Sequence, residues 1–489
     1  MFLEVGKFLR VCWLRVAAIS VVLLTPCLWH RRIEAGDLPS HVYNAWLAQL
    51  IGRGQAPGLY IAQRWNNVAL DWALLHLGNV FGLAAAEKIA VYLSVLIFFW
   101  GAFALLAAVA QRPPWFLLPC LAMLAYGWTF NIGFFNYYIS LGLGFFATAI
   151  FWKGRGRELV AGFVLAALML VAHPQGFAWL AGCVGYLLLW RVLPGWWKLA
   201  VLVGAAAAIV AARLYLFRHD FGASSVFESF GPGIYNGTDQ IDLYSWKSHI
   251  LSYVALGFGL LCFVTDAVTR GRNLEAWKPL RLPFELHCIA VFATYMLPDD
   301  LRIPLFAAGI GAMAIRLTTV SAVMGLAVLA QMQPKKWHTV GFGGIALAFF
   351  VFLYQDTGVL SRMEEQAGQL VSTLPRGQRV LATIWPAEDS RLPHIVHLVD
   401  RACVGKCFVF QNYEPASGQF RVRVRAGSPL AADNPETAEK MEAGEYVVQK
   451  KDLPIWEINQ CDEDDPTKLC LRPLAAGELN GVPGYRPPQ

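Results

Sequence analysis

The chain has 489 residues, of which 56% are hydrophobic and 15% charged, and its formal net charge is +6. Soluble domains carry about 45–50% apolar and about 25% charged residues, so this composition excludes an ordinary soluble protein and indicates a polytopic membrane protein. The basic residues lie in loops between apolar segments, which membrane topology explains, so the charge does not indicate a nucleic-acid partner.

Apolar segments that approach the length needed to cross a hydrocarbon core of about 30 Å recur through most of the chain. Lys and Arg precede the first segment and return in every second loop, as in Lys153–Arg157 and Thr269–Arg281. By the positive-inside rule, the N-terminus is then cytoplasmic and the C-terminal tail lies outside. We expect eleven spans, at about 12–29, 88–110, 115–131, 134–152, 159–172, 176–190, 199–217, 249–265, 284–297, 304–331 and 339–354.

Two outer loops are long. The first, residues 30–87, contains apolar pieces at 40–51 and 68–81. A helix over the second piece would rise only about 21 Å, too short to span, so we expect it to lie at the membrane interface and help to roof a cavity. The second long loop, 218–249, is rich in Gly, Ser and aromatic residues, a composition typical of a mobile loop that closes on a ligand.

The remainder of the chain is polar. We expect a membrane domain over 1–354, a short linker helix over 355–374 and a soluble domain over 375–489. Within the soluble domain, "RVLATIW", "CFVFQNY" and "GEYVVQKK" have the pattern of strands, and "LPHIVHLVDRACV" that of a helix. The predicted fold class is therefore a mainly α polytopic membrane protein with a small C-terminal extracytoplasmic α/β domain.

Four cysteines lie in the polar tail, and an even number there suits two disulfides in an oxidising compartment. Of the three possible pairings we favour Cys403 with Cys407 and Cys461 with Cys470. The alternative is a zinc site made by the four thiolates, although the C-x3-C and C-x8-C spacings are not those of a standard zinc ribbon.

Polar side chains collect at the outer ends of the predicted spans, whereas the cytoplasmic ends offer mainly Lys and Arg. Ionisable groups at membrane depth are costly, so they tend to face a cavity or a partner and to mark function. We therefore expect the active face to be the outer one. The candidate residues are Asp37, His41, Asn136, His173, Gln175, Asp300 and Arg302.

Asp37, in "GDLPSH", is the candidate for chemistry. A carboxylate at the rim of a partly dry cavity can act as a general base on a hydroxyl group or hold a divalent metal. The alternative is that Asp37 caps the helix that follows it, because an acidic residue just before an early Pro is typical of an N-cap. His41 would lie one turn further along that helix, so both side chains would face one cavity.

The other polar candidates also have two interpretations. His173, in "AHPQGF", is either a solvated turn histidine or a hydrogen-bond donor to a phosphate or a sugar. Arg302 is suited to bidentate binding of a lipid phosphate, and pairing with Asp299 is the alternative. The sequence contains no Walker loop, no G-x-G-x-x-G fingerprint after a strand, no H-E-x-x-H and no G-x-S-x-G elbow.

This layout resembles the GT-C superfamily of membrane glycosyltransferases, which includes protein O-mannosyltransferases and bacterial aminoarabinose transferases. The resemblance rests on an acidic residue at the start of a long first outer loop, on interfacial helices in that loop, on about eleven spans and on an outer C-terminal domain. "GDLPSHVYNAWLAQLI", "NIGFFNYYISLGLG" and "AHPQGF" are similar to stretches of bacterial proteins described as GT-C-like. The resemblance to the GT-C superfamily covers about the first 355 residues of the chain.

The resemblance implies a sugar transfer from a polyprenyl-phosphate-type donor, usually with inversion, at the outer face of a bacterial inner membrane. Asp37 would activate an acceptor hydroxyl, and His173 or Arg302 would stabilise the leaving phosphate, where negative charge develops. Many members of the superfamily have two acidic residues together in the first loop, whereas Leu38 follows Asp37 here, so a divalent metal remains an option that this pattern does not favour, and no other cofactor is identified. The acceptor, a glycan, lipid or protein, is not defined.

Two other classes of protein remain as alternatives. A transporter or lipid flippase would share the spans and the positive-inside loops, but it would be expected to have broken helices in matching halves, and the sequence has no such symmetry. A non-catalytic envelope assembly protein would use the tail to bind partners and the membrane part as an anchor, for which eleven spans are more than an anchor needs.

Overall fold

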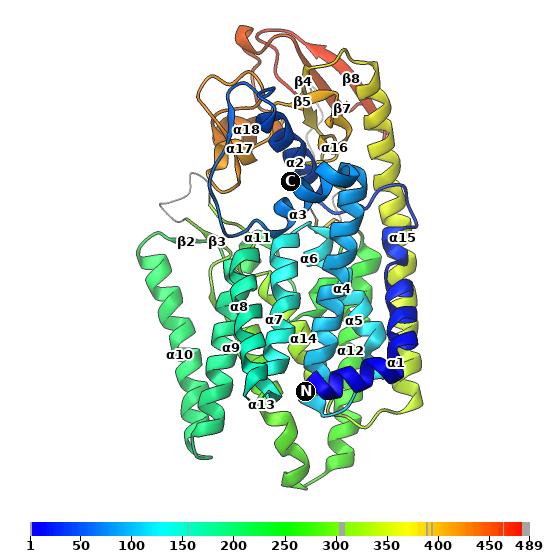
Figure 1. The fold of residues 1–489 in the computed structure, drawn as a ribbon, viewed down its shortest axis with the longest axis vertical. Coiled ribbons are helices and arrows are strands. Elements are labelled where there is room, and N and C mark those ends of the chain that lie inside the picture. The colour runs from blue at the N-terminus through cyan, green and yellow to red at the C-terminus, as the bar shows by residue number, and fades with distance from the viewer. Residues whose placement is uncertain are drawn as a thin grey trace.

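The computed structural model describes residues 2–154, 156–302, 309–387, 390–392, 395–462 and 464–481, with the backbone alone for residues 2–12. A bundle of long helices occupies one end of the molecule, and a small sheet occupies the other (Figure 1). The helices of the bundle are α1 (Phe2–Leu23), α4 (Leu83–Ala110), α5 (Leu118–Ala125), α6 (Trp128–Asn131), α7 (Phe135–Lys153), α8 (Arg157–Ala172), α9 (Pro174–Val192), α10 (Trp197–Arg218), α12 (Trp246–Arg270), α13 (Leu274–Met296), α14 (Leu317–Leu329) and α15 (Lys336–Thr373).

The apolar helices match a multi-pass membrane protein. Among the described residues, five helices are long and apolar enough to cross a membrane, namely α4, α7, α10, α12 and α15. None of the residues of α10 is buried, as expected for a helix that faces lipid. Trp13–Leu23 of α1 and the whole of α14 are apolar but shorter. The protein is thus mainly helical with several apolar helices, and the number of eleven spans stays a prediction.

Two expected spans differ in detail. The segment 115–131 is divided into a 3-10 turn (Trp115–Leu117), α5 and α6, with a break before Gly127. The segment 304–331 was expected to be one span, but its helix begins only at Leu317, and residues 303–308 lie outside the described part. Hydrophobicity alone does not separate an apolar loop from an apolar helix, which explains both differences.

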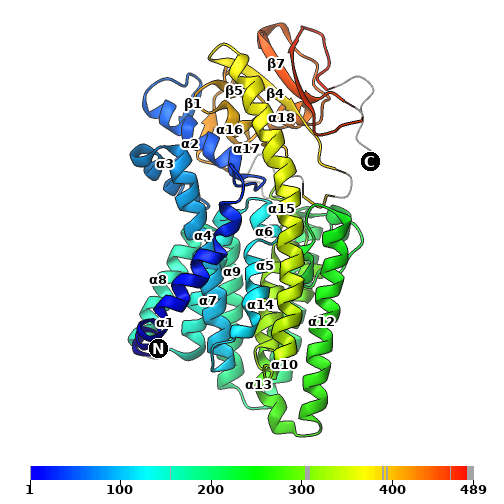
Figure 2. The same cartoon turned by 90° about the vertical axis from the view of Figure 1, so that its right-hand side faces the viewer.

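Helix α15 is 38 residues long and runs from the bundle to the C-terminal sheet without a break (Figure 2). The expected linker, 355–374, is therefore helical, but it continues the last span instead of following it as a separate helix. The helix ends at Thr373, because Leu374 precedes Pro375 and a residue before proline disfavours the helical conformation. The division into domains stays a prediction.

The C-terminal sheet has four strands in the order β5-β4-β7-β8. Strand β4 pairs in parallel with β5 and β7, and β7 pairs antiparallel with β8. The predicted first two strands exist, whereas "GEYVVQKK" forms only an isolated bridge and a 3-10 turn, and the third strand follows it. The strands are β4 (Gln378–Thr383), β5 (Cys407–Val409), β7 (Ile455–Gln460) and β8 (Leu469–Leu474).

The predicted helix "LPHIVHLVDRACV" is much shorter in the structure. Its described part contains a turn over 395–399 and the single-turn helix α16 (Asp400–Cys403). The two expected disulfides, Cys403–Cys407 and Cys461–Cys470, are both confirmed. The first disulfide links the end of α16 to the start of β5. The second links the residue after β7 to β8. Two further short helices, α17 (Glu414–Ser417) and α18 (Pro435–Glu442), complete this part.

The first outer loop is packed against the C-terminal part. Its helices are α2 (Leu38–Gly52) and α3 (Ala69–Phe81), close to the expected limits. Between them, β1 (Leu59–Ile61) pairs antiparallel with β6 (Val422–Val424) of the C-terminal part. Most residues of the first half of α2 are buried, so α2 is a buried connector. The interfacial position expected for residues 68–81, which form α3, stays a prediction.

The second long loop is also ordered by contacts. It contains β2 (Gly222–Ala223), which pairs with β3 (Asp300–Leu301), and the short helix α11 (Val226–Phe230). The stretch from Asp239 to Leu243 is buried. Asp242 accepts a hydrogen bond from Arg391 of the C-terminal part at 2.7 Å. This loop is therefore built into the junction between the bundle and the sheet, whereas its composition suggested a mobile loop that closes on a ligand.

A buried arginine, Arg401 of α16, holds the C-terminal part to the bundle. Its Nε and Nη2 donate to the two carboxylate oxygens of Glu364 in α15, at 2.8 and 2.6 Å. Its Nη1 donates to Glu87 of α4, and both terminal nitrogens donate to the carbonyl oxygen of Ile33 at 3.2 Å. These bonds use all five donors of the guanidinium. Glu34 lies 4.0 Å from Nη2, and we name this group the Arg401 cluster.

Candidate functional site

Asp37 lies at the point where the first outer loop meets the helix bundle. Its backbone N–H donates to the carbonyl oxygen of Ile132 at 3.0 Å. Gly133 has a φ of +91°, and a Cβ atom there would lie 2.3 Å from the Asp37 nitrogen. Only glycine permits so close an approach at that φ. The turn before α7 therefore fixes the backbone position of Asp37.

The carboxylate of Asp37 does not cap helix α2. Asp37 occupies the N-cap position, but its side chain makes no capping hydrogen bond. Among the described residues it makes no other hydrogen bond, and the cations that face it are His397, His41 and Arg316. Burial raises the pKa of Asp37 above its usual value, and the three cations oppose this rise. A carboxylate in this state is a stronger base than an exposed one.

His41 forms a buried pair with Asp71 of α3. Its Nδ1 lies 3.0 Å from Oδ1 of Asp71. Burial lowers the pKa of His41, but Asp71, Glu414 and Asp37 outweigh this effect and raise the pKa to about 9. Asn136 at the start of α7 donates to the other oxygen of Asp71 at 3.4 Å. His41 is thus a cation near Asp37, and Asn136 orients the carboxylate that holds it.

The C-terminal part contributes a second pair of this kind. His397, in the turn before α16, is buried, and its Nδ1 lies 3.1 Å from Oδ2 of Asp400. Burial lowers the pKa of His397, whereas Asp400, Asp37 and Glu442 raise it to about 10. The ring of Tyr413 lies 5.8 Å from the imidazole, measured between centroids. A cation from the C-terminal part therefore faces Asp37.

Arg316, directly before α14, is the third cation, and it is only 8% exposed. Its guanidinium lies 3.9 Å from the centroid of the Phe134 ring, and Nη1 lies 3.3 Å from Nε2 of His173. Its Nε is buried and has no hydrogen-bond partner among the described residues. The Asp37 carboxylate is one of the charges that face it, but the two form no salt bridge within the described part of the chain. An unsatisfied buried donor is costly, which marks a position for a bound acceptor group.

His173 caps helix α9. Its Nδ1 accepts from the backbone N–H of Gln175 at 3.2 Å, and its ring packs edge-on against Tyr137. The burial of the ring and the neighbouring Arg316 lower the pKa of His173, so the ring is neutral. It is therefore not a solvated turn histidine, the simpler of the two interpretations of this residue.

An apolar cavity of about 490 Å³ lies between α9, α10, α13 and α14. Gln175, Met313 and Leu317 line it, and they are within three residues of His173 or Arg316 in the chain. Gln175 donates to the carbonyl oxygen of Met313 at 2.7 Å, while its Oε1 is buried without a described partner. The lining of this cavity is almost entirely apolar, and Leu317, which lines it, directly follows Arg316 in the chain.

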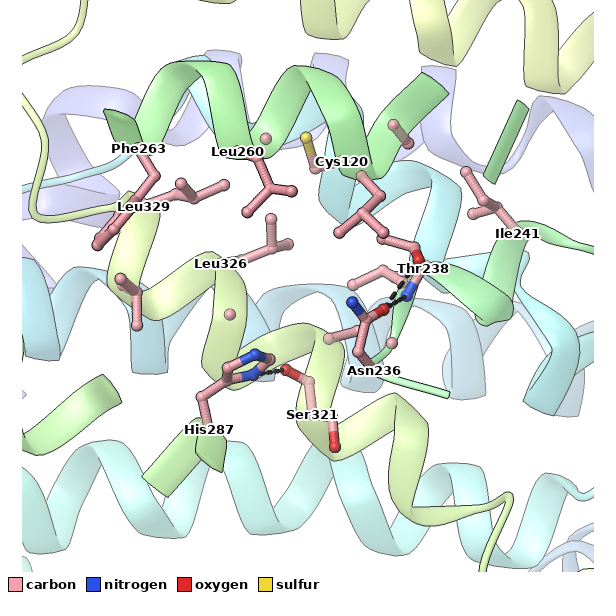
Figure 3. Close-up of a pocket in the computed structure, with 18 of the residues that line it drawn as sticks. Cys120, Asn236, Thr238, Ile241, Leu260, Phe263, His287, Ser321, Leu326 and Leu329 are labelled. Atoms are coloured by element: carbon pink, nitrogen blue, oxygen red, sulfur yellow. Dashed lines mark hydrogen bonds between the residues drawn. The ribbon is translucent and has the colours of Figure 1, made fainter. Parts of the chain in front are cut away.

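A second apolar cavity, of about 260 Å³, lies along a different face of α14, among α5, α12 and α15 (Figure 3). Its few polar groups serve the protein itself. Nδ1 of His287 lies 2.9 Å from the carbonyl oxygen of Ser321, and Asn236 accepts from the hydroxyl of Thr238 at 2.8 Å. This cavity therefore offers apolar walls and lacks the unbonded ionic groups found around Asp37.

Two of the predicted polar residues lie apart from this group. Asp300 is in β3 and accepts a hydrogen bond from Ser224 at 2.8 Å. Arg302 is exposed just after β3. Neither contributes to the electrostatic environment that shifts the pKa of Asp37. Asp299 accepts from two backbone N–H groups before α14 at 3.1 and 3.2 Å, so it shapes the turn that carries the buried arginine and does not pair with Arg302.

The described side chains include no group of three or more His, Cys, Asp or Glu residues arranged to hold a metal ion. His41 and His397 are each engaged with a carboxylate, and both are protonated near neutral pH. A protonated imidazole cannot ligate a metal.

Sequence reasoning missed Arg316, Asp71, His397 and Asp400. Arg316 stands alone in the apolar run "GAMAIRLTTV" and Asp71 in "VALDWALL", and a lone charge in an apolar segment is a usable signal. His397 and Asp400 have the i, i+3 spacing of a helical pair, but nothing in the sequence indicates that they face Asp37, more than 350 residues away in the chain. That proximity depends on the docking of the C-terminal part.

No protein-family model matches the chain, and no curated protein matches it. Among solved structures, one similar chain is described as "Crystal Structure of ArnT from Cupriavidus metallidurans bound to Undecaprenyl phosphate". The two chains share 13% identity with a TM-score of 0.47, and the match covers 92% of this chain and 93% of the other. At this identity and TM-score the similarity carries neither an activity nor a ligand over to this chain.

Proposed function

We propose that this chain is a membrane glycosyltransferase that moves a sugar from a polyprenyl-phosphate-type lipid to an acceptor hydroxyl. The observation that supports this proposal is the arrangement of two charged side chains and one apolar cavity. Asp37 makes no described hydrogen bond, and its charge interacts with that of Arg316, a buried guanidinium with a spare donor. Arg316 directly precedes Leu317, which lines an apolar cavity of about 490 Å³. A lipid-linked sugar phosphate has an apolar chain, an anion and a reactive carbon in the same order.

Arg316 supports binding of the phosphate. A buried guanidinium binds phosphate through charge-assisted hydrogen bonds and presents its donors in a fixed plane. The stacking of Arg316 on Phe134 fixes that plane, and the absence of a described partner for Nε leaves one donor for the ligand. The lipid chain would then extend into the cavity lined by Gln175 and Leu317.

Asp37 supports the role of general base. In the proposed reaction, the acceptor oxygen forms a bond to the anomeric carbon while the bond from that carbon to the phosphate oxygen breaks. The electron pair of the broken bond passes to the phosphate, whose charge Arg316 stabilises, and the proton of the acceptor hydroxyl passes to Asp37. Attack from the side opposite the leaving group inverts the configuration at that carbon.

The proposed site is on the side of the bundle that carries the C-terminal sheet. The two disulfides of that part suit an oxidising compartment, and the alternation of basic loops gives the same orientation. We therefore propose an extracytoplasmic reaction at a bacterial inner membrane, with the N-terminus in the cytoplasm.

Transfer of a labelled sugar from synthetic polyprenyl-phosphate donors tests the proposal in membranes that contain the full chain. The wild type should transfer label, and Asp37→Asn should lower the rate at least about 100-fold, since a positioned base contributes about 10²–10⁴-fold. Glu275→Gln is the matched control, because within the described part of the chain this exposed carboxylate pairs only with Lys278, three residues away. Unchanged transfer in Asp37→Asn would exclude Asp37 as the base, and a wild type inactive with every such donor would contradict the proposed function.

A further inference from the structure

We propose that one face of the two-stranded β1–β6 sheet binds the acceptor, and that this acceptor is a glycan with phosphate or carboxylate groups. The inference rests on the proposed function and adds to it the chemical class of the acceptor. The face is formed by Arg421, Arg423 and Arg425, in and beside β6, together with Tyr60 of β1, and we name it the arginine face.

The three arginines share one side of the sheet because they alternate along the chain. Successive residues of a strand point to opposite sides, and alternate residues are about 6.5–7 Å apart. Tyr60 lies directly opposite Arg423 in the antiparallel register, so its ring is on the same side. The guanidinium of Arg425 lies 5.5 Å from the centroid of that ring. Val422, on the other side, is buried. The result is a row of three positive charges at a regular spacing.

The protein supplies no negative charge for this row. Residues 53–70 and 415–432, which contain the two strands, include five arginines and no Asp, Glu or Lys. Among the described residues, none of the three arginines of the row forms a salt bridge, and Nε of Arg423 is buried without a hydrogen-bond partner. A buried donor without a partner lowers the stability of the folded protein. The arginine face therefore has the properties of a site for an anion that the chain does not contain.

Arg64, just after β1, adds a further positive charge beside this row. Its Nη1 donates to the carbonyl oxygen of Gln419, which holds the guanidinium against the segment that leads into β6. Burial and the like charge of Arg423 lower the pKa of Arg64. An anion bound between two cations would remove their mutual repulsion. The position of Arg64 thus also favours an anionic ligand.

The inner end of the row lies beside the candidate site. Arg421 and Asp71 line the same small cavity, of about 20 Å³, together with Asn44 of α2. Oδ1 of Asp71 lies 3.0 Å from Nδ1 of His41, and the backbone N–H of His41 donates to the carbonyl oxygen of Asp37 at 3.0 Å. An acceptor bound along the row would therefore have one end close to the proposed base.

The place of β1 in the molecule favours a ligand outside the bilayer. In Figure 2, β1 lies near the level of β5, beyond α3 and away from the long apolar helices. Guanidinium groups bind phosphate and carboxylate through paired hydrogen bonds. The ring of Tyr60 is 40% exposed and offers a flat, partly apolar surface on which a sugar ring can pack. A glycan with acidic groups at a regular spacing matches both features.

Binding of two glycan probes that differ only in charge tests the inference on the purified full chain. Oligogalacturonate has a carboxylate on each sugar, and its methyl ester is neutral. We expect the wild type to bind the acid at least about tenfold more tightly than the ester, because the ester lacks the charge-assisted hydrogen bonds. This preference should decrease as the salt concentration rises, since the face is open to solvent.

The combined variant Arg421→Gln, Arg423→Gln and Arg425→Gln should bind the acid at least about tenfold more weakly than the wild type. If it does not fold, Arg425→Gln alone, at an exposed position, should show the same loss in part. The matched control removes three positive charges at other exposed positions of the C-terminal part and should bind like the wild type. It combines Arg376→Gln, Lys450→Gln and Lys451→Gln.

The charge of the transfer product tests the acceptor itself. Labelled sugar is transferred in membranes that contain the full chain, and mild acid then destroys the unused lipid donor. We expect the labelled product to be retained on an anion-exchange column, and the combined variant to form less of it than the matched control. A product that is not retained, made by an active wild type, would overturn the inference.

Equal binding of the acid and its ester would also overturn it, as would equal binding by the combined variant and the control. Tighter binding of polyglutamate than of oligogalacturonate would assign the face to an acidic polypeptide, and binding to phosphatidylglycerol vesicles alone would assign it to the membrane surface. Both results contradict a glycan ligand. The outcome is separable from the proposed function, because a wild type that is inactive with every polyprenyl-phosphate donor refutes the transfer and leaves the measured glycan binding in place.

Discussion

Two buried ionic clusters lie at the junction between the helix bundle and the C-terminal sheet, and they differ in how completely they are bonded. In the Arg401 cluster, all five guanidinium donors are used by Glu364, Glu87 and the carbonyl of Ile33, although Oε1 of Glu34, at the edge of the cluster, is buried without a described partner. Around Asp37, the carboxylate has no described hydrogen bond, and Nε of Arg316 has no described partner.

This difference separates a structural cluster from a candidate chemical one. Buried charges are stabilised only when their hydrogen bonds are satisfied, so the complete bonding of Arg401 serves folding. Buried polar groups without hydrogen bonds lower the stability of the folded protein. A binding site retains such groups when a ligand forms the missing hydrogen bonds. The group around Asp37 also includes His41 and His397. It therefore has the properties of a site in which bound substrates form the hydrogen bonds that the protein leaves unmade.

Disruption of the Arg401 cluster should produce the largest loss of stability. Arg401→Met leaves the carboxylates of Glu364 and Glu87 buried without their cation, which typically costs about 3–5 kcal/mol. We expect the variant to unfold at a markedly lower temperature in detergent, or not to accumulate as folded protein. Arg376→Met, at an exposed position, is the matched control and should unfold like the wild type. Equal unfolding temperatures for both variants would contradict the structural role.

Substitution of Arg316 should lower activity without lowering stability. Arg316→Met removes a buried cation that has an unsatisfied donor, so the unfolding temperature should stay the same or rise. Sugar transfer should fall about 100-fold, with a raised KM for the lipid donor, because the phosphate loses its charge-assisted hydrogen bonds. Arg316→Lys keeps the charge without the planar fork and should be intermediate. A lower unfolding temperature together with an unchanged KM would show that Arg316 stabilises the fold and does not bind the lipid donor.

Glu34 allows a finer test at the edge of the Arg401 cluster. Burial, together with the carboxylates of Glu364 and Glu87, raises the pKa of Glu34 from 4.5 to about 8, while Arg401 opposes the rise. The folded protein therefore retains a proton that the unfolded chain loses, and this contribution to stability is lost as the pH rises through about 8. Glu34→Gln should match the wild type near pH 4.5 and unfold about 2–4 °C higher near pH 9. A difference that does not depend on pH would contradict the shifted pKa.

Some residues of these two clusters could be predicted from the sequence, and others could not. Asp37 was proposed because an acid at a membrane exit is conspicuous, and the pairing that was favoured among the three possible for the tail cysteines is the one observed. The run 304–331 was assigned to one span, which hid the turn that carries Arg316. His397 could not be connected to Asp37, since their proximity requires the tail to fold back over the first outer loop. Local patterns thus located single residues, whereas the site depends on long-range docking.

The most direct test of the distinction between the two clusters is a paired measurement on Asp37→Asn and Glu364→Gln, with thermal unfolding and sugar transfer recorded on the same preparations. Asp37→Asn replaces a half-buried carboxylate that makes no described hydrogen bond with a neutral amide, so it should unfold at the wild-type temperature or higher and transfer sugar at least about 100-fold more slowly. Glu364→Gln should unfold at a lower temperature and retain transfer in proportion to its folded fraction. An Asp37→Asn variant that unfolds earlier and loses activity only in proportion to that instability would contradict the account.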